Sequence, residues 1–242
     1  MQPRCYILFW DCQLRSFLLR PDGAWLDIRC FDRCTADFSM DRLNFGTLTG
    51  FYAVECGNVL GLGGAFYASL CAVGILSKEE KDKTAEFLLT HPVSRKRVIT
   101  EKLIAAIIQI TAMNIIVYAP AVGSIGAVGE TIPLKEISLM HLAYYLLQLE
   151  LAGICFGVSA FLRKGSVGVG LGIAVMMYFL NLIANIADVA EFLKYITPFG
   201  YCDGADIVSN GSLDVTLVAI GTVLGISGTI ITYLKYTKKD IH

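Results

Sequence analysis

The sequence predicts an all-α membrane protein, a polytopic bundle of transmembrane helices. Of its 242 residues, 55% are hydrophobic and only 17% are charged, a composition well outside that of soluble proteins. Five apolar segments are each long enough to cross about 30 Å of hydrocarbon as a helix. We therefore divide the chain into an atypical N-terminal region, 1–50, and a transmembrane domain, 51–242. The five predicted spans are about 51–76, 103–123, 141–162, 167–187 and 213–234.

The N-terminal region, 1–50, shows neither a helical nor a strand period. Its mildly apolar stretch is interrupted by Asp11 and Arg15, and charged side chains are costly at the centre of a bilayer. Cys30 and Cys34 have a spacing that could begin a zinc site, but no histidine or second cysteine pair follows at ligand spacing. We expect no metal site here, and the structure of this region cannot be derived from its residues.

A densely charged segment follows the first predicted span. Ser77 and Glu80 have the spacing of a capping box, which predicts a short surface helix beginning at Lys78. Pro92 should end that helix, because proline lacks an amide donor and disfavours the helical conformation of the residue before it. Ser94 should then cap a second, longer helix that enters the bilayer.

The distribution of basic residues predicts the orientation of the chain. Lys and Arg cluster at 78–102, 163–164 and 235–239, whereas the links at 129–140 and 188–212 are acidic or mixed. Positively charged segments next to membrane spans usually face the cytoplasm. We therefore expect a multi-pass protein with a cytoplasmic C-terminus. The net charge of −1 gives no reason to expect nucleic acid as a partner.

Four of the five predicted spans contain Gly-x-x-x-Gly. This spacing places two glycines on one helix face and lets a neighbouring backbone approach closely within the bilayer. The pattern does not distinguish a contact inside the bundle from a contact between two copies of the chain. The pairs are Gly57 with Gly61, Gly153 with Gly157, Gly168 with Gly172, and Gly221 with Gly225.

Glu150 lies near the middle of the third predicted span, and no Lys or Arg lies at matching depth in another span. A carboxylate there costs about 2.5–3.5 kcal/mol on insertion scales. We expect its side chain to be protonated, to be exposed to a polar cavity, or to hydrogen-bond with Gln109, Asn114 or Asn181. Two roles remain open: a structural hydrogen bond, or a place on a translocation path together with Asn114 and Gln109.

Catalytic patterns are missing from the sequence. The chain has no phosphate-binding loop of the G-x-x-x-x-G-K-[ST] type, so we expect it neither to hydrolyse ATP nor to carry a cofactor. Glu79 and Glu80 could suggest an intramembrane metalloprotease. His91 and His141 do not stand at helical spacing from them, so we expect no catalytic residues and no metal ligands.

The segment Glu79–Arg97, EEKDKTAEFLLTHPVSRKR, has an acidic start, a Thr-x-Glu-Phe-Leu core and a Pro-Val-Ser-Arg end. It resembles the cytoplasmic segment of bacterial ABC-type transporter permeases of the exporter-like type 2 class. The resemblance covers about residues 45–242. It implies a short coupling helix that fits a groove on a separate cytoplasmic ATPase subunit. The positions it implies for this contact and its corner are Glu80, Thr84, Glu86, Phe87 and Pro92.

The resemblance implies the rest of an assembly. A permease of this kind exports a substrate across the cell membrane, pairs with a second permease copy or a related permease, and uses ATP bound by its partner subunits. The family pattern has six spans, and the connection at 188–212 is similar to its re-entrant or interfacial element; an ordinary external loop is the alternative. A non-transporting membrane scaffold or sensor, docking a cytoplasmic partner through the charged helix, is the alternative function. The substrate stays open.

Overall fold

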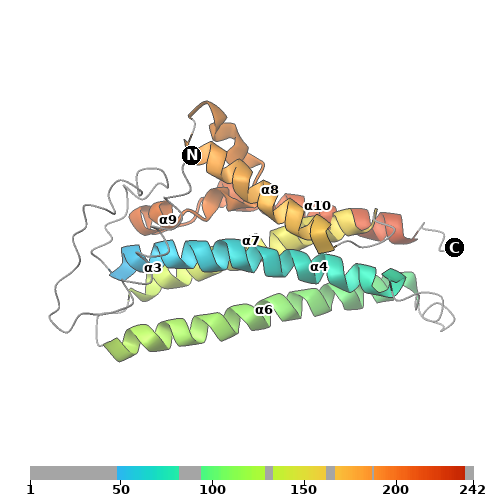
Figure 1. Cartoon of the computed structure of the whole chain (residues 1–242), viewed down its shortest axis with the longest axis horizontal. Coiled ribbons are helices and arrows are strands. Elements are labelled where there is room, and N and C mark those ends of the chain that lie inside the picture. The colour runs from blue at the N-terminus through green and yellow to red at the C-terminus, as the bar shows by residue number, and fades with distance from the viewer. Residues whose placement is uncertain (1–47, 82–93, 129–132, 162–166, 187, 238–242) are drawn as a thin grey trace, which may run out of the picture. The chain divides into compact units, whose positions relative to one another are not determined.

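The computed structural model describes residues 48–81, 94–128, 133–161, 167–186 and 188–237 (Figure 1). All of them belong to the compact unit Asn44–His242. The described residues form helices and no strand, and five of the helices are long and apolar enough to cross a membrane. The predicted fold class, an all-α polytopic membrane protein, is confirmed.

The first span is built from three consecutive helical stretches. They are α3 (Leu48–Cys56), the π-helix η4 (Gly57–Gly63) and α4 (Gly64–Lys81). The predicted helix start at Lys78 is wrong, because α4 continues without a break through Ser77. Residues 75–81 contain neither Gly nor Pro, so nothing in the backbone stops the helix there. The rest of the predicted surface helix lies outside the described residues.

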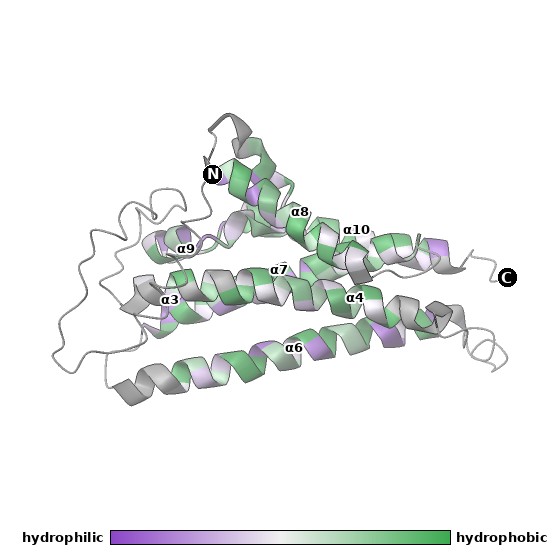
Figure 2. Cartoon of the chain, in the orientation of Figure 1, coloured by the Kyte–Doolittle hydropathy of each residue, from purple (hydrophilic) through white to green (hydrophobic). Residues whose placement is uncertain are grey.

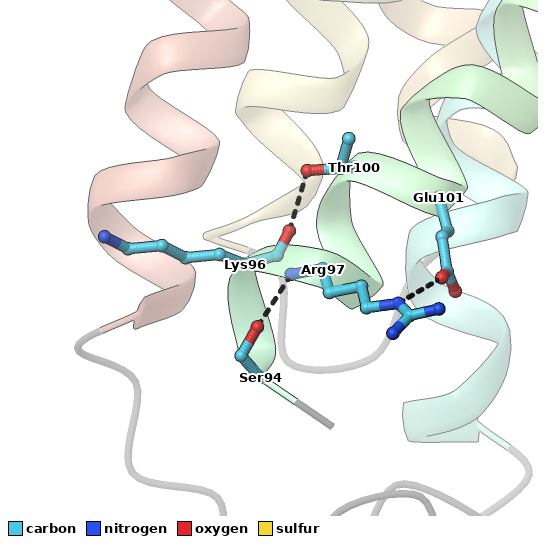
Figure 3. Close-up of polar contacts among 5 residues, drawn as sticks. All are labelled: Ser94, Lys96, Arg97, Thr100 and Glu101. Carbon is cyan, nitrogen blue, oxygen red and sulfur yellow. Dashed lines mark hydrogen bonds and ion pairs between the residues drawn. The ribbon is translucent and has the colours of Figure 1, made fainter. Parts of the chain in front are cut away.

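The second span belongs to α6 (Arg95–Val128), and its start agrees with the sequence. The amide of Arg97 donates to Ser94 Oγ at 3.4 Å, so the predicted cap is confirmed. One turn further, the hydroxyl of Thr100 donates to the carbonyl of Lys96 at 2.8 Å (Figure 3). Arg97 also pairs with Glu101 at 2.8 Å, but both side chains are exposed, so this ion pair stabilises the helix little.

The remaining spans are α7 (Leu134–Ser159), α8 (Val167–Ile186) and α10 (Val215–Thr237). Helix α7 begins earlier than the third predicted span, so Lys135 and Glu136 lie in its first turn rather than in a link. An acidic side chain is favourable at that position because of the helix dipole.

The contacts between helices fix their relative directions. Moving along the first span from Gly57 to Gly64, the neighbours on α7 change from Tyr144 to Gln148, so the two helices run in parallel. Helices α7 and α10 are also parallel. Gly153 lies against Gly225, and Gly157, further along α7, lies against Gly228, further along α10. Helix α6 runs the opposite way: Asn114 meets Gln148, and Tyr118 meets Ser138. The alternation fits successive crossings of a bilayer.

One end of the bundle gathers positive charge. The start of α6 meets the end of α10 through the hydroxyls of Thr100 and Tyr233, which lie 2.7 Å apart. Exposed Lys96, Arg97 and Lys235 lie at this end, which we call the basic end.

Helix α7 is the central helix of the described bundle. In its most apolar stretch of 18 residues, 67% is buried inside the bundle. In the corresponding stretches of α6, α8 and α10, only 17–22% is buried. Apolar residues predominate along these three outer helices in Figure 2, and large side chains such as Ile116 and Val223 are exposed on them. Exposed apolar faces of this kind suit contact with lipid.

The connection between α8 and α10 is helical over most of its length. It consists of η5 (Asp188–Tyr195), η6 (Pro198–Tyr201) and α9 (Gly204–Asn210), the first two being 3₁₀-helices. Pro198, Phe199 and Tyr201 are all buried. The η6 part of the connection is therefore packed against the spans, whereas Phe192 and Tyr195 of η5 are exposed.

The start of α10 offers a test of local stability. Asp214 Oδ1 accepts from the amides of Thr216 at 2.8 Å and Leu217 at 3.4 Å, as an N-cap does. We expect Asp214→Ala to lower the free energy of unfolding by about 1 kcal/mol, and Asp214→Asn to retain the stability. Thermal unfolding in detergent measures both; equal losses in the two variants would mean that the carboxylate acts through its charge rather than as a cap.

Candidate functional site

The site centres on Glu150 of α7, whose side chain is only 3% exposed. Its Oε2 accepts a hydrogen bond from the hydroxyl of Tyr201 in η6 at 2.8 Å. Its Oε1 accepts one from Thr222 Oγ1 in α10 at 3.0 Å. Three elements thus meet at one carboxyl group, and both of its oxygens are satisfied.

The expected partners of Glu150 were wrong. Asn114 Nδ2 donates instead to Gln148, at 2.6 Å, and Gln109 is exposed on α6. Asn181 Oδ1 is buried without a hydrogen-bond partner among the described residues. Tyr201 could not be expected from span positions, because it reaches Glu150 only through the fold of the connection after α8.

Glycines of α10 create the space for this carboxyl group. A Cβ added to Gly221 would collide with Oε2 of Glu150 and lie 3.0 Å from its Oε1, and one added to Gly225 would lie 3.0 Å from the Cα of Glu150. Only glycine fits such close approaches, because every other residue carries a Cβ. The sequence of α10 is thus matched to the side chain that it faces.

Tyr201 lies in η6, outside the five candidate spans. Burial, together with the neighbouring Cys202 and Glu150, raises the pKa of its hydroxyl well above the ordinary value. The hydroxyl therefore keeps its proton at neutral pH and donates a hydrogen bond to Glu150. A tyrosine that is fully protonated and buried is a stable donor to a carboxyl group.

Other hydrogen bonds hold the segment around Tyr201. Thr197 Oγ1 donates to the carbonyl of Met177 on α8 at 3.0 Å. The hydroxyl of Tyr144 on α7 donates to the carbonyl of Cys202 at 3.1 Å, and Cys202 Sγ donates to the carbonyl of Ala143 at 3.6 Å. The segment is therefore attached to α7 and α8 on both sides of Tyr201.

A second polar cluster lies between the first span, α6 and α7. Gln148 is fully buried; its Oε1 accepts from Asn114 at 2.6 Å, and its Nε2 donates to the carbonyl of Leu60 at 3.4 Å. A Cβ on Gly64 would collide with the Gln148 amide. Leu60 belongs to η4, and π-helical turns inside helices are rare and frequently occur at functional sites. Sequence reasoning missed Gln148, although an amide side chain inside an apolar predicted span, two residues before Glu150, was a visible signal.

Comparison with protein families gives one decisive result. A family model described as an ABC-2 family transporter protein matches residues 39–240. The chain belongs to the ABC-2 transporter family. It is a multi-pass membrane permease of an ABC transporter. Comparison with curated proteins and with solved structures gave no match.

The glycine pairs of this ABC-2 permease lie in different surroundings. Gly153 and Gly157 of α7 face the backbone of α10: a Cβ on Gly153 would collide with the carbonyl of Gly225, and one on Gly157 would lie 2.7 Å from the Cα of Gly228. The pair Gly153 and Gly157 therefore makes a contact inside the chain. Gly228 was not among the expected residues.

The other glycine pairs of the permease do not meet a backbone. A Cβ on Gly57 would lie 3.1 Å from the hydroxyl of Tyr144, and one on Gly61 would lie 3.4 Å from its ring. Gly168 and Gly172 are exposed on α8. Gly170, between them, packs instead against the first span. A Cβ added to Gly170 would lie 3.0 Å from the carbonyl oxygen of Ser69.

His141 of the permease has an aromatic environment. Its Nε2 lies 2.6 Å from the hydroxyl of Tyr52, and the ring of Tyr118 meets it edge-on at 4.9 Å between centroids. Its Nδ1 is buried without a hydrogen-bond partner among the described residues. Its neighbours are therefore aromatic side chains of α3 and α6.

The residues expected to couple the permease to an ATPase cannot be placed by this structure. Glu80 lies in the last turn of α4, and its side chain is not described. The others, Thr84, Glu86, Phe87 and Pro92, lie outside the described residues.

Proposed function

We propose that this ABC-2 permease is the transmembrane subunit of an ATP-driven exporter, which binds ATP only through a separate ATPase subunit. The observation that supports this most strongly is the family match over residues 39–240. A second permease, identical or related, completes the membrane part. The chain itself supplies the membrane path and the surface on which the ATPase docks.

The basic end is the face that we assign to the cytoplasm. Lys96, Arg97 and Lys235 are exposed there, at the start of α6 and near the end of α10. Positive residues next to membrane spans favour the cytoplasmic side. In this orientation the C-terminus and the segment between α4 and α6 face an ATPase in the cytoplasm.

Helices α4 and α6 are the elements that would receive a push from the ATPase. The segment that joins them carries Glu86 and Phe87, the positions that the resemblance places at the contact. Near the basic end the two helices are tied together, because Lys102 Nζ donates to the carbonyl of Ile75 at 3.0 Å. Helix α4 in turn packs along α7. A displacement at the coupling segment would therefore reach the central helix.

Co-purification tests the proposed function. The tagged permease is expressed with the ABC ATPase encoded nearest to it and purified from membranes. We expect the ATPase to accompany the wild type and to be lost, by about tenfold or more, from Phe87→Asp and Glu86→Lys, because the first change adds a charge to the proposed contact and the second reverses one.

The matched control is Phe192→Asp, which makes the same change at a side chain that is 61% exposed in η5. It should retain the ATPase. If no ATPase accompanies the intact protein, the exporter proposal fails and the scaffold or sensor function takes its place. If Phe192→Asp loses the ATPase as Phe87→Asp does, the coupling segment is not the docking site.

A further inference from the structure

We propose that the seam between α6 and α10, the surface along which these two helices adjoin, binds an anionic phospholipid at the basic end. Lys96 of α6 and Lys235 of α10 are exposed there, on helices that meet through Thr100 and Tyr233. Neither lysine forms an ion pair with another residue that the structure describes. Basic sites between transmembrane helices bind anionic headgroups, so the two charges are suited to a lipid phosphate.

Thr100 and Tyr233, the hydroxyl pair, set the depth of the seam. Their oxygens lie 2.7 Å apart, and tyrosine is enriched where a span reaches the headgroups. Lys96 lies four residues before Thr100, and Lys235 lies two residues after Tyr233. At 1.5 Å per residue, the lysines stand about 6 Å and about 3 Å beyond the pair, toward the basic end. Both ammonium groups are therefore placed at the level of lipid phosphates.

The basic side chains at this end differ in their directions. Figure 3 shows Lys96 extended from α6 toward α10, whereas Arg97 turns the other way and pairs with Glu101 at 2.8 Å. Lys235 Nζ lies 5.1 Å from the centre of the Phe161 ring. A cation over a ring keeps N–H donors for an anion, because an ammonium group has three of them. The seam thus presents two lysine charges, while the charge of Arg97 is partly balanced elsewhere.

The seam becomes apolar on the bilayer side of the hydroxyl pair. One and two turns further in, α6 carries Ile104 and Ile107, and α10 carries Ile230 and Ile226, each on the face of its helix that bears the hydroxyl pair. All four side chains are exposed, as contact with acyl chains requires. A lipid with a negative headgroup therefore matches the seam along its length, whereas a free phosphate would match only the lysines. The proposed orientation decides only which leaflet supplies the lipid.

Native mass spectrometry of the full-length permease in detergent tests the proposal. The protein is stripped of lipid and titrated with phosphatidylglycerol or with phosphatidylcholine of the same acyl chains, and the lipid-bound fraction gives each dissociation constant. We expect phosphatidylglycerol to bind about 25-fold more tightly, because each lysine near an anionic headgroup contributes about fivefold. Lys96→Gln and Lys235→Gln should each weaken this binding about fivefold, and the double variant about 25-fold.

Lys135→Gln is the matched control, because Lys135 is exposed at the start of α7, at the opposite end of the bundle. This control should bind as the wild type does, and so should Lys96→Arg with Lys235→Arg, which keeps both charges. Equal binding of the two lipids overturns the proposal, and so does an equal loss in Lys135→Gln. Glycerol 3-phosphate that competes as well as the lipid also overturns it, in favour of a soluble phosphate. No ATPase is needed, so the outcome is independent of the co-purification result.

Discussion

Gly153→Leu is expected to separate α7 from α10 and to be the most damaging single change in the bundle. A Cβ on Gly153 would collide with the carbonyl oxygen of Gly225 and lie 2.9 Å from its Cα, so backbone rather than a flexible side chain stands in the way. Overpacking of this kind costs about 3 kcal/mol or more. The shift of α10 would also withdraw Thr222 from Glu150.

Thermal unfolding in detergent measures this effect, and for a chain of this size we expect the midpoint to fall by about 6–12 °C. The matched control is Gly172→Leu, which makes the same change on α8, where nothing lies within 4 Å of the added Cβ. The control should unfold at the wild-type temperature. A Gly153→Leu protein as stable as this control would contradict the close backbone contact.

Gln148→Leu should have the second largest effect, because it removes two hydrogen bonds between buried groups. The amide of Asn114 loses its acceptor at 2.6 Å, and the carbonyl of Leu60 loses a donor. A hydrogen bond between buried groups contributes about 0.5–1.5 kcal/mol, so the loss of two costs about 1–3 kcal/mol. Asn114→Leu should cost a similar amount, because it removes the donor of the buried Oε1 of Gln148.

The double variant Asn114→Leu with Gln148→Leu distinguishes a specific bond from general damage. If the two amides depend on each other, the double variant loses less than the sum of the single losses, by about 1 kcal/mol. Gln109→Leu is the control, since this amide is exposed on α6 and should be replaced without loss. Strictly additive losses would show that Asn114 and Gln148 act separately.

Local signals in the sequence predicted the helical bundle but not its internal contacts. Hydropathy is enough to identify five spans, because each span must be apolar along its own length. The Ser94 cap is equally local, whereas the Ser77 cap failed because the same residues also suit a helix interior. The partners of Glu150 depend on distant segments, so no spacing rule could name Tyr201 or Thr222.

The glycine pairs show the same limit. Gly-x-x-x-Gly predicts that a neighbour approaches closely, but it does not say which atoms approach. Gly153 meets a backbone, Gly61 meets the ring of Tyr144, and Gly172 meets nothing among the described residues. Gly64 and Gly221, which admit Gln148 and Glu150, show that a glycine in a span can serve a polar side chain on another helix.

The pairing of Glu150 with later parts of the chain has a consequence for biosynthesis. Tyr201 and Thr222 follow Glu150 by 51 and 72 residues, so α7 leaves the ribosome before either donor exists. At 5–20 residues per second, the second donor appears roughly 4–14 s later. During that interval the carboxyl group of α7 lacks its native donors. The third span therefore reaches its final state only when the last span is made, and insertion of this protein ends as a joint event of α7 and α10.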